Sequence, residues 1–324
     1  MNKTMEIVTA DIGGTHARFA LAELSAGRVS LTSEAVFKTA QHASLQTAWE
    51  AFGTHLARPL PRAAGIAIAC PVLGDVLQFT NSPWVIRVSA LKRQLGLDEL
   101  TLINDFAAVG HSVANIDEAH LKAICGPNLP IPTEGVISVI GPGTGLGVAQ
   151  VVRRGSTYDV ISTEGGHISF APFDRLEDLI LLHLRQRYLR VSAERLVSGP
   201  GLANIYAALA AIEGRPVNLG EDEALWEVAI SGEDTLAAAA LERFCLCFGA
   251  CAGDIALAQG ASTVVIAGGL ALRLADRLVR SGFSQRFTAK GRFESMMASI
   301  PVKLITYSQP GLLGAAAAFA QAHH

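Results

Sequence analysis

The chain has 324 residues and a formal net charge of −3; 50% of its residues are hydrophobic and 17% are charged. This composition excludes a disordered chain, and the negative charge removes the broad cationic field that non-specific nucleic-acid binding requires, though not a local basic patch. At roughly 100–200 residues per domain, the length predicts two domains or one large domain. The 31 glycines and the low charge favour a tightly packed α/β protein.

The first part of the chain alternates short strands, turns and helices. An apolar strand over residues 5–10 ends at Asp11, and a tight turn leads to a returning strand over 18–22. Hydrophobic spacing then predicts the following elements: a strand over 28–32, a helix over 44–56, a strand over 64–69, a helix over 89–95, a strand over 100–103 and a helix over 106–113.

The same layout restarts near residue 135 and indicates a duplicated fold. A strand over 135–140 runs into a glycine-rich turn, and a returning strand over 148–152 is followed by a third over 158–161. The remaining predicted elements are helices over 175–188, 202–212 and 236–259, strands over 263–267 and 302–306, and a C-terminal helix over 312–322.

Membrane spans, a signal peptide and disulfide bonds are not expected. Three long uncharged stretches begin near Gly135, Ile255 and Leu304, but small and polar residues interrupt each of them. The chain has five cysteines, an odd number. Three of them form a cluster over residues 245–251, which has apolar neighbours and no histidine. We therefore interpret that cluster as part of a buried helix rather than as a zinc site, and expect a cytoplasmic protein without membrane or nucleic-acid partners.

The turn after the first strand suits a nucleotide phosphate. The backbone N–H groups of Gly13 and Gly14 can approach an anion without side-chain obstruction, and Thr15 adds a hydroxyl donor. Asp11 suits a Mg²⁺ position, directly or through water. A plain β-hairpin needs only the two glycines, so the additional presence of Asp11, Thr15 and Arg18 favours phosphate binding.

The second turn, Gly141–Gly147, carries four alternating glycines, more than a hairpin requires. No helix follows it and its spacing is not that of a dinucleotide-binding motif. The chain also contains no Gly-Lys pair, which excludes a Walker P-loop. Close approach of a phosphate at Gly143, Thr144 and Gly145 is the interpretation that explains the excess of glycine.

Three further motifs are ambiguous on their own. Asn104 and Asp105 end a strand, where they could face a ligand or cap the next helix. Glu164 and His167 flank a glycine pair and could both face one polyol, joined by Glu194, which alone is more often a helix-capping acid. The Gly-Gly pair at 268–269 suits either a flat base or a plain strand-to-helix turn.

As an ordered set, these motifs resemble the bacterial ATP-dependent glucokinase family, which belongs to the superfamily of sugar kinases and actin. The strings that carry the resemblance are Asp11–Arg18, Thr80–Trp84, Leu102–Phe106, Gly141–Gly147, Glu164–His167, Ser198–Leu202, Ile266–Gly269 and Pro310–Gly314. A related repressor and kinase group carries a cysteine-rich zinc motif after its Glu-x-Gly-His segment, and this chain has none there. The resemblance is therefore to the zinc-free group.

The resemblance implies a two-lobed actin-like ATPase fold, also called ribonuclease H-like, with duplicated mixed-sheet α/β domains and a cleft between them. It implies a small domain formed by residues 1–106 and 301–324 and a large domain formed by 107–300. The implied activity is ATP-dependent phosphorylation of D-glucose at the 6-hydroxyl, which yields ADP and glucose 6-phosphate for glycolysis. Mg²⁺ is the implied metal, and a homodimer is the implied assembly.

The resemblance also assigns roles to single residues. Asp105 is the general base, and the other sugar hydroxyls are held by Asn81, Asn104, Glu164, His167 and Glu194. The phosphates are cradled by Gly13, Gly14, Thr15, Arg18, Gly143, Thr144 and Gly145. Asp11 positions Mg²⁺, and Gly268 and Gly269 lie beside the adenosine. A non-catalytic sensor, a phosphoanhydride hydrolase and a kinase for another hexose are the alternatives that the sequence leaves open.

Overall fold

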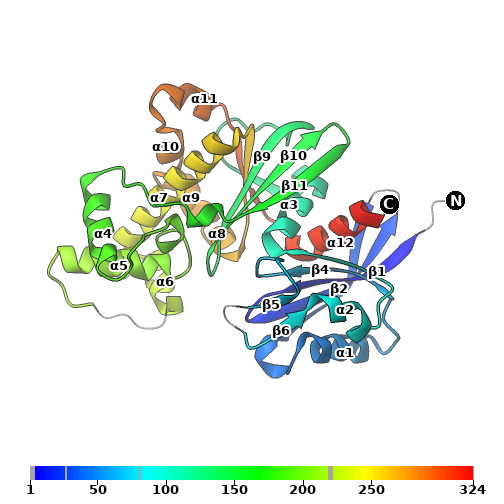
Figure 1. Ribbon diagram of the computed structural model, residues 1–324. Coiled ribbons are helices and arrows are strands. Elements are labelled where there is room, and N and C mark those ends of the chain that lie inside the picture. The colour runs from blue at the N-terminus through cyan, green and yellow to red at the C-terminus, as the bar shows by residue number, and fades with distance from the viewer. Residues whose placement is uncertain (1–3, 26–27, 80–81, 218–221, 324) are drawn as a thin grey trace. The chain divides into compact units, whose positions relative to one another are not determined.

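The computed structural model describes residues 4–25, 28–79, 82–217 and 222–323, which fall into two compact units (Figure 1). Unit 1 comprises Met1–Asp117, Val160–Ser162 and Tyr307–His324, and unit 2 comprises Glu118–Asp159 and Thr163–Thr306. The family resemblance implies boundaries after residue 106 and before residue 301. The division differs because the helix that starts at Asp105 packs on the C-terminal helix, whereas the strand that starts at Val302 pairs inside unit 2.

Unit 1 is built on a five-stranded sheet with the order β3-β2-β1-β4-β7. Its strands are β1 (Met5–Ile12), β2 (His16–Ser25), β3 (Arg28–Lys38), β4 (Ala63–Ile68) and β7 (Glu99–Asn104). The first three are antiparallel, and β4 and β7 continue parallel to β1. This order brings the carboxyl ends of β1, β4 and β7 to one edge of the sheet.

Helices cover both faces of this sheet, as Figure 1 shows for α1 (Leu45–Leu56) and α12 (Pro310–His323). Alternate residues of β1 divide between the faces: Val8 and Ala10 join the core with α1, and Ile7 joins the core with α12. Ser44 caps α1 with a capping box: its side chain accepts from the Thr47 N–H, and the Thr47 side chain accepts from the Ser44 N–H.

The C-terminal helix approaches its neighbours very closely through glycines. A Cβ at Gly314 would collide with the carbonyl oxygen of Ala108 in α3 (Asp105–Asn115), and one at Gly65 would collide with that of Ala315. Backbone atoms cannot move aside cheaply, so both positions require glycine. This packing fixes α3, and with it the residues at its N-terminus.

The rest of unit 1 consists of short elements that hydrophobic periodicity did not resolve, apart from the predicted helix α2. They are η1 (Thr39–Gln41), β5 (Val76–Gln78), β6 (Val85–Arg87) and α2 (Val88–Gln94). β5 and β6 form a separate two-stranded sheet.

The second sheet, which lies in unit 2 except for Val160–Ser162 of β11, repeats the first and adds one strand, in the order β11-β10-β9-β12-β13-β8. The strands are β8 (Leu121–Cys125), β9 (Glu134–Pro142), β10 (Leu146–Arg154), β11 (Thr157–Thr163), β12 (Thr263–Ile266) and β13 (Val302–Ile305). As in unit 1, the first hairpin is antiparallel, and β12 then pairs parallel to β9. The predicted duplication is thus visible in the strand order.

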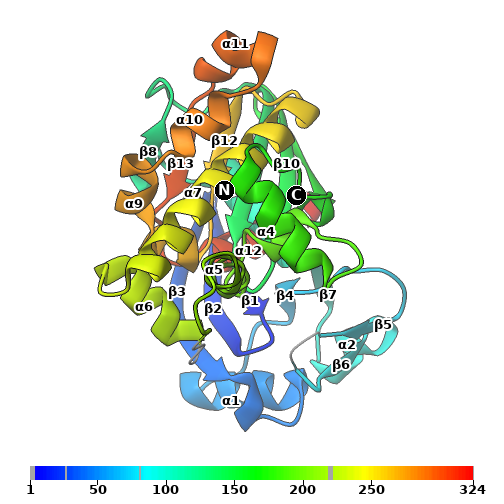
Figure 2. The same cartoon turned by 90° about the vertical axis from the view of Figure 1, so that its left-hand side faces the viewer.

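Helices supply most of the core of unit 2. They are α4 (Arg175–Arg185), α5 (Gly201–Ile212), α6 (Asp222–Ser231), α7 (Thr235–Gln259), α8 (Gly269–Arg273), α9 (Ala275–Arg280), α10 (Phe283–Thr288) and α11 (Glu294–Ala298), with 3₁₀ turns at η2 (Glu118–His120), η3 (Gly165–His167), η4 (Ala193–Arg195) and η5 (Gly291–Phe293). Figure 2 shows α7 running among the other helices of this unit, where it packs on α5, α6 and α10.

Helix α7 holds the cysteine cluster. Cys245, Cys247 and Cys251 are buried free thiols, which confirms the interpretation as part of a buried helix. Among the described residues, α7 is also the one helix whose length and apolarity would suffice to cross a membrane. Of its most apolar 18-residue window, 72% is buried inside the unit, so this helix is accounted for as a core element.

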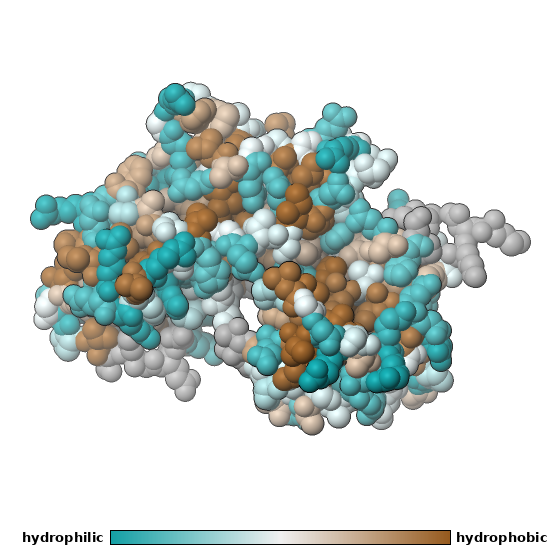
Figure 3. Space-filling model, viewed as in Figure 1, coloured by the Kyte–Doolittle hydropathy of each residue, from teal (hydrophilic) through white to brown (hydrophobic). Residues whose placement is uncertain are grey.

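Hydrophobic and hydrophilic residues are mixed on the surface. Large hydrophobic side chains are exposed at Leu73, Phe173, Leu182 and Leu189, among others. On the face seen in Figure 3, hydrophobic residues lie between hydrophilic ones on both units. Apolar atoms contribute much of any protein surface, so exposure of this kind does not by itself mark a docking site.

Candidate active site

Asn104 and Asp105 lie where β7 passes into α3. Asn104 is the N-cap of α3: its Oδ1 accepts hydrogen bonds from the N–H groups of Phe106 (2.9 Å) and Ala107 (3.1 Å). Its Nδ2 donates to Oδ1 of Asp105 at 2.9 Å. The two interpretations of this pair therefore combine, because the residue that caps the helix also orients the carboxylate beside it.

Asp105 has a carboxyl group with a strongly raised pKa. Burial and the negative charge of Asp11 raise its pKa to about 6, against the opposing effect of hydrogen bonds from the Phe106 N–H and the Asn104 amide. A carboxylate with a pKa near neutrality is ionised at physiological pH and still basic enough to accept a proton. The shift matches what a general base requires.

Asp11 is the penultimate residue of β1, opposite Arg18 on β2, and the Arg18 guanidinium lies 3.4 Å from its Oδ2. Burial raises the pKa of Asp11, and Arg18 opposes this. The first turn of α12 lies against the carboxylate: a Cβ at Gly311 would stand 2.7 Å from Oδ2, so glycine is needed there. The helix N-terminus favours a negative charge at this position.

The Asp11 carboxylate also fits Mg²⁺ better than it fits a metal held by protein alone. Among the described residues, no group of three or more His, Cys, Asp or Glu could hold a metal ion. Mg²⁺ commonly uses one or two carboxylates and completes its shell with water and substrate phosphates. Asp11, with 21% of its side chain exposed, offers one such carboxylate.

The first glycine turn is held by β3 and η1. The Gly13 N–H donates to the His16 carbonyl at 2.9 Å, and Thr39 donates from its N–H to the Thr15 carbonyl at 3.0 Å and from its hydroxyl to the Gly14 carbonyl at 2.6 Å. Within the described part of the chain, the N–H groups of Gly14 and Thr15 have no acceptor. Of the predicted phosphate donors, these two are therefore available and Gly13 is not.

The second glycine turn is held by a hydrogen bond of its own and by residues far away in the sequence. The Gly143 N–H donates to the Gly145 carbonyl, and the Gly199 N–H donates to the Gly143 carbonyl, both at 2.7 Å. Gly199 is held in turn by the Trp226 indole, which donates to its carbonyl at 3.0 Å. A Cβ at Gly143 would meet nothing within 4 Å, so this position is open to a ligand.

Two of the predicted sugar residues of unit 2 meet where η3 and η4 lie together: His167 Nε2 is 3.8 Å from Oε1 of Glu194. Glu164 is the exposed N-cap residue of η3. A Cβ at Gly166 would collide with the Leu146 carbonyl, so the glycine pair lets this segment pack on the second hairpin. Oε2 of Glu194 also accepts a hydrogen bond from the Leu146 N–H at 2.9 Å.

Gly268 and Gly269 form a strand-to-helix turn, which was one of the two interpretations of this pair from the sequence. Gly268 has a φ of 99° and is the N-cap of α8. This backbone conformation strains any other residue and explains the glycine without a ligand. The adenosine contact of Gly268 and Gly269 stays a prediction, and Asn81 lies outside the described residues.

Sequence reasoning missed four residues that support the site. Thr39 and Gly199 hold the two turns, and Gly311 makes room for Asp11. Arg190 donates to the His167 carbonyl at 2.6 Å. Gly199 and Gly311 each adjoin a proline in the strings that carry the family resemblance, a signal that could have assigned them a role.

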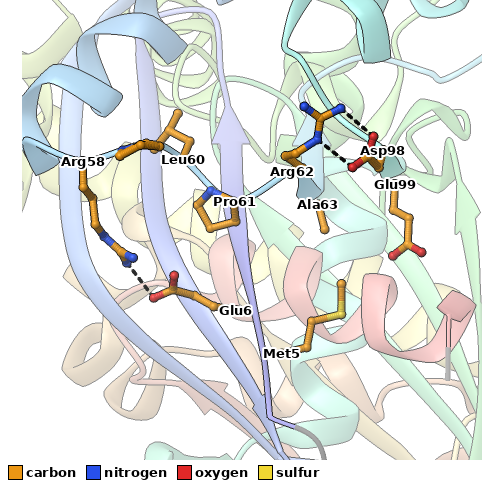
Figure 4. A pocket seen from close by; sticks show the side chains of 10 residues that line it. Met5, Glu6, Arg58, Leu60, Pro61, Arg62, Ala63, Asp98 and Glu99 are labelled. Atoms are coloured by element: carbon orange, nitrogen blue, oxygen red, sulfur yellow. Dashed lines mark hydrogen bonds and ion pairs between the residues drawn. The ribbon is translucent and has the colours of Figure 1, made fainter.

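A pocket on unit 1 lies away from these residues, at the amino ends of β1, β4 and β7 (Figure 4). The Arg58 guanidinium pairs with Glu6 at 2.6 Å, and that of Arg62 pairs with both Asp98 carboxylate oxygens at 2.7 Å. Both cations are thus neutralised by protein carboxylates. Ligands of α/β sheets bind at the carboxyl ends of the strands, where Asp11 and Asp105 lie.

Comparison with known proteins identifies the family. A family model described as glucokinase matches residues 8–322. The chain is 63% identical over 317 residues to a glucokinase of Zymomonas mobilis, covering 98% of both chains.

Solved structures agree. The crystal structure of a glucokinase from an Antarctic psychrotroph superposes with a TM-score of 0.86 at 35% identity, covering 98% of this chain and 99% of that one. A ROK-family glucokinase from Streptomyces griseus, solved with glucose and AMPPNP, matches with a TM-score of 0.61 at 20% identity over 96% and 98% of the chains, and so shares the fold. The predicted actin-like α/β fold is confirmed, and the chain belongs to the glucokinase family of enzymes.

Proposed function

We propose that the chain transfers a phosphoryl group from ATP to the 6-hydroxyl of D-glucose and releases glucose 6-phosphate and ADP. The observation that carries this proposal is Asp105, a carboxylate with a pKa of about 6 at the carboxyl end of β7. Family membership supports the reaction class, and the fold-sharing Streptomyces griseus enzyme was solved with glucose and an ATP analogue.

Asp105 acts as the general base in this proposal. Its carboxylate accepts the proton of the 6-hydroxyl as that oxygen attacks the γ-phosphorus, while Asn104 holds the carboxylate in place through a 2.9 Å hydrogen bond. Phosphoryl transfer depends mainly on positioning and charge neutralisation. Mg²⁺ bound at Asp11 would neutralise charge on the phosphates, and Arg18 adds a second positive charge.

The remaining sugar hydroxyls are assigned to Glu164, His167 and Glu194, with Asn104 and Asn81 as further contacts. Carboxylates accept hydrogen bonds and imidazole both donates and accepts, which suits a neutral polyol. A site built to bind a hydroxyl rejects an analogue without it by roughly 10⁴-fold or more. This set of side chains supports a sugar as the acceptor.

The phosphates are assigned to the two glycine turns. In the first, the free N–H groups of Gly14 and Thr15 are the donors, with Gly13 serving the turn itself. In the second, Gly143, Thr144 and Gly145 form the contact surface, and Gly268 and Gly269 lie beside the adenosine. A place in glycolysis, the cytoplasm as location and a homodimer complete the proposal.

The test is ADP release from Mg-ATP with and without a panel of hexoses. Strong stimulation by glucose, together with formation of glucose 6-phosphate, is the expected result. Stimulation by a different hexose alone would overturn the substrate assignment, and phosphate release that needs no sugar would identify a hydrolase. Glucose binding without turnover would identify a sensor.

A further inference from the structure

The Glu194 carboxylate lies between the predicted sugar residues and the second glycine turn. One oxygen, Oε1, is 3.8 Å from His167 Nε2, and the other, Oε2, accepts the Leu146 N–H at 2.9 Å. The side chain is 23% exposed, so part of it remains accessible to a ligand. A carboxylate is planar and rigid, so a contact that turns one oxygen also moves the other.

Leu146 is enclosed by the two segments that carry the sugar residues. Its N–H is held by Glu194, and its carbonyl packs where a Cβ at Gly166 would collide. Leu146 is buried and is the first residue of β10, directly after the turn. Both η3 and η4 thus contact Leu146, the residue at which the turn joins the sheet.

Gly145 and Gly143 are glycines for different reasons. Neither has a φ in the left-handed region, so backbone conformation does not require glycine at either position. A Cβ at Gly145 would collide with Oε2 of Glu194 and stand 3.2 Å from its Cδ, whereas one at Gly143 would meet open space. In this structure, the absence of a Cβ at Gly145 leaves room for the Glu194 carboxylate.

We propose that Glu194 is a positioning residue for the phosphate-binding turn as well as a sugar ligand, and that Gly145 is glycine to admit its carboxylate. The proposal rests on the function proposed above. It assigns a sugar-side role to a residue of the phosphate-side motif. The binding of glucose and the binding of ATP are then coupled through one carboxylate inside unit 2.

The first experiment measures AMPPNP binding by calorimetry in the absence of sugar. Because a hydrogen bond contributes about 0.5–1.5 kcal/mol, Glu194→Ala should weaken AMPPNP binding by about 3- to 10-fold. Glu194→Gln keeps an oxygen that can accept from the Leu146 N–H and should restore binding to within about twofold of wild type. Equal AMPPNP affinity in the Ala variant and wild type would refute the positioning role.

The second experiment compares Gly145→Ala with Gly143→Ala, two identical changes in one turn. Glucose affinity, measured by calorimetry without nucleotide, should fall about tenfold in Gly145→Ala and stay within about twofold in Gly143→Ala, because the first Cβ alone displaces Glu194. In a Glu194→Ala background, adding Gly145→Ala should cost no further glucose affinity. Thermal melting verifies that each variant is folded.

The outcomes separate this inference from the proposed function. If Gly145→Ala binds glucose as wild type does but binds AMPPNP weakly, Gly145 is a phosphate contact only and the inference is wrong. If wild type binds no glucose, the proposed substrate is wrong, yet the AMPPNP titration of the Glu194 variants still decides the positioning role.

Discussion

The two glycine turns occupy equivalent places in the two sheets, yet they are held in different ways. Each follows a central strand, β1 or β9, and leads into an antiparallel partner. The first turn is held locally, by Thr39 at the end of the same three-stranded meander. The second is held by Glu194 of η4 and by Gly199 after it, which lie about fifty residues further along the chain.

The charges of the site also divide unequally between the turns. Asp11 and Arg18 flank the first turn, and the Asp11 charge acts on Asp105 within the same unit. The second turn has no charged residue of its own and receives the Glu194 carboxylate from outside. In the roles proposed above, duplicated backbone geometry places catalytic charge in one copy and leaves substrate coupling to the other.

Among the tests of this comparison between the turns, the largest expected effect comes from removing the charge at the first turn. Asp11→Asn should lower kcat by about 10²–10³-fold, the usual cost of losing one electrostatic group at a transition state. Asp159→Asn, a change of the same kind at an exposed ion pair, is the matched control and should leave kcat unchanged. Steady-state kinetics at saturating Mg-ATP provides the measurement, and equal kcat values in the two variants would contradict the assignment.

The pH dependence of kcat/KM for glucose is expected to report the negative charge of Asp11. Asp105 must be ionised to accept a proton, so kcat/KM should fall about tenfold per pH unit below its pKa of about 6. Since the negative charge of Asp11 raises that pKa, Asp11→Asn should move the acidic limb to lower pH. An acidic limb that stays in place in this variant would show that a different group, such as the nucleotide, controls it.

The smallest effect should come from the local support of the first turn. Thr39→Val removes the hydroxyl that donates to the Gly14 carbonyl, and the KM for ATP should rise by about 3- to 10-fold. Thr39→Ser retains a hydroxyl and is the control. Glucose affinity should not change in either variant, which distinguishes this turn from the second one. A rise in glucose KM with Thr39→Val would break the distinction.

The sequence predicted the parts of the fold that depend on local pattern. The strands of both sheets other than β8 and the long helix α7 follow from hydrophobic periodicity and end signals. Elements such as β5, β6 and α8 to α11 are too short for a periodic pattern and were missed, as were β8 and α6, although short strands such as β12 were found from their β-branched residues. Bounds of strands and helices differ by a few residues, as frayed ends do.

The site was predictable as a set of residue types and less so as a set of contacts. Asp11, Asp105, Glu164, His167 and Glu194 stand out because charged side chains end strands or adjoin glycines. Thr39 and Arg190 do not, because a threonine hydroxyl or an arginine gains its role only from a carbonyl that folding brings near. The reason for glycine at 145 likewise depends on the Glu194 carboxylate, which no local pattern shows.

The central claim, that Asp105 is the general base, is tested most directly by Asp105→Asn. The amide keeps an oxygen to accept from the Phe106 N–H, and burial already disfavours the charged carboxylate, so the variant should fold at least as stably as wild type. We predict that kcat for glucose phosphorylation falls by about 10²–10⁴-fold while glucose affinity by calorimetry stays within a few-fold. A folded, glucose-binding variant with kcat near the wild-type value would contradict the account.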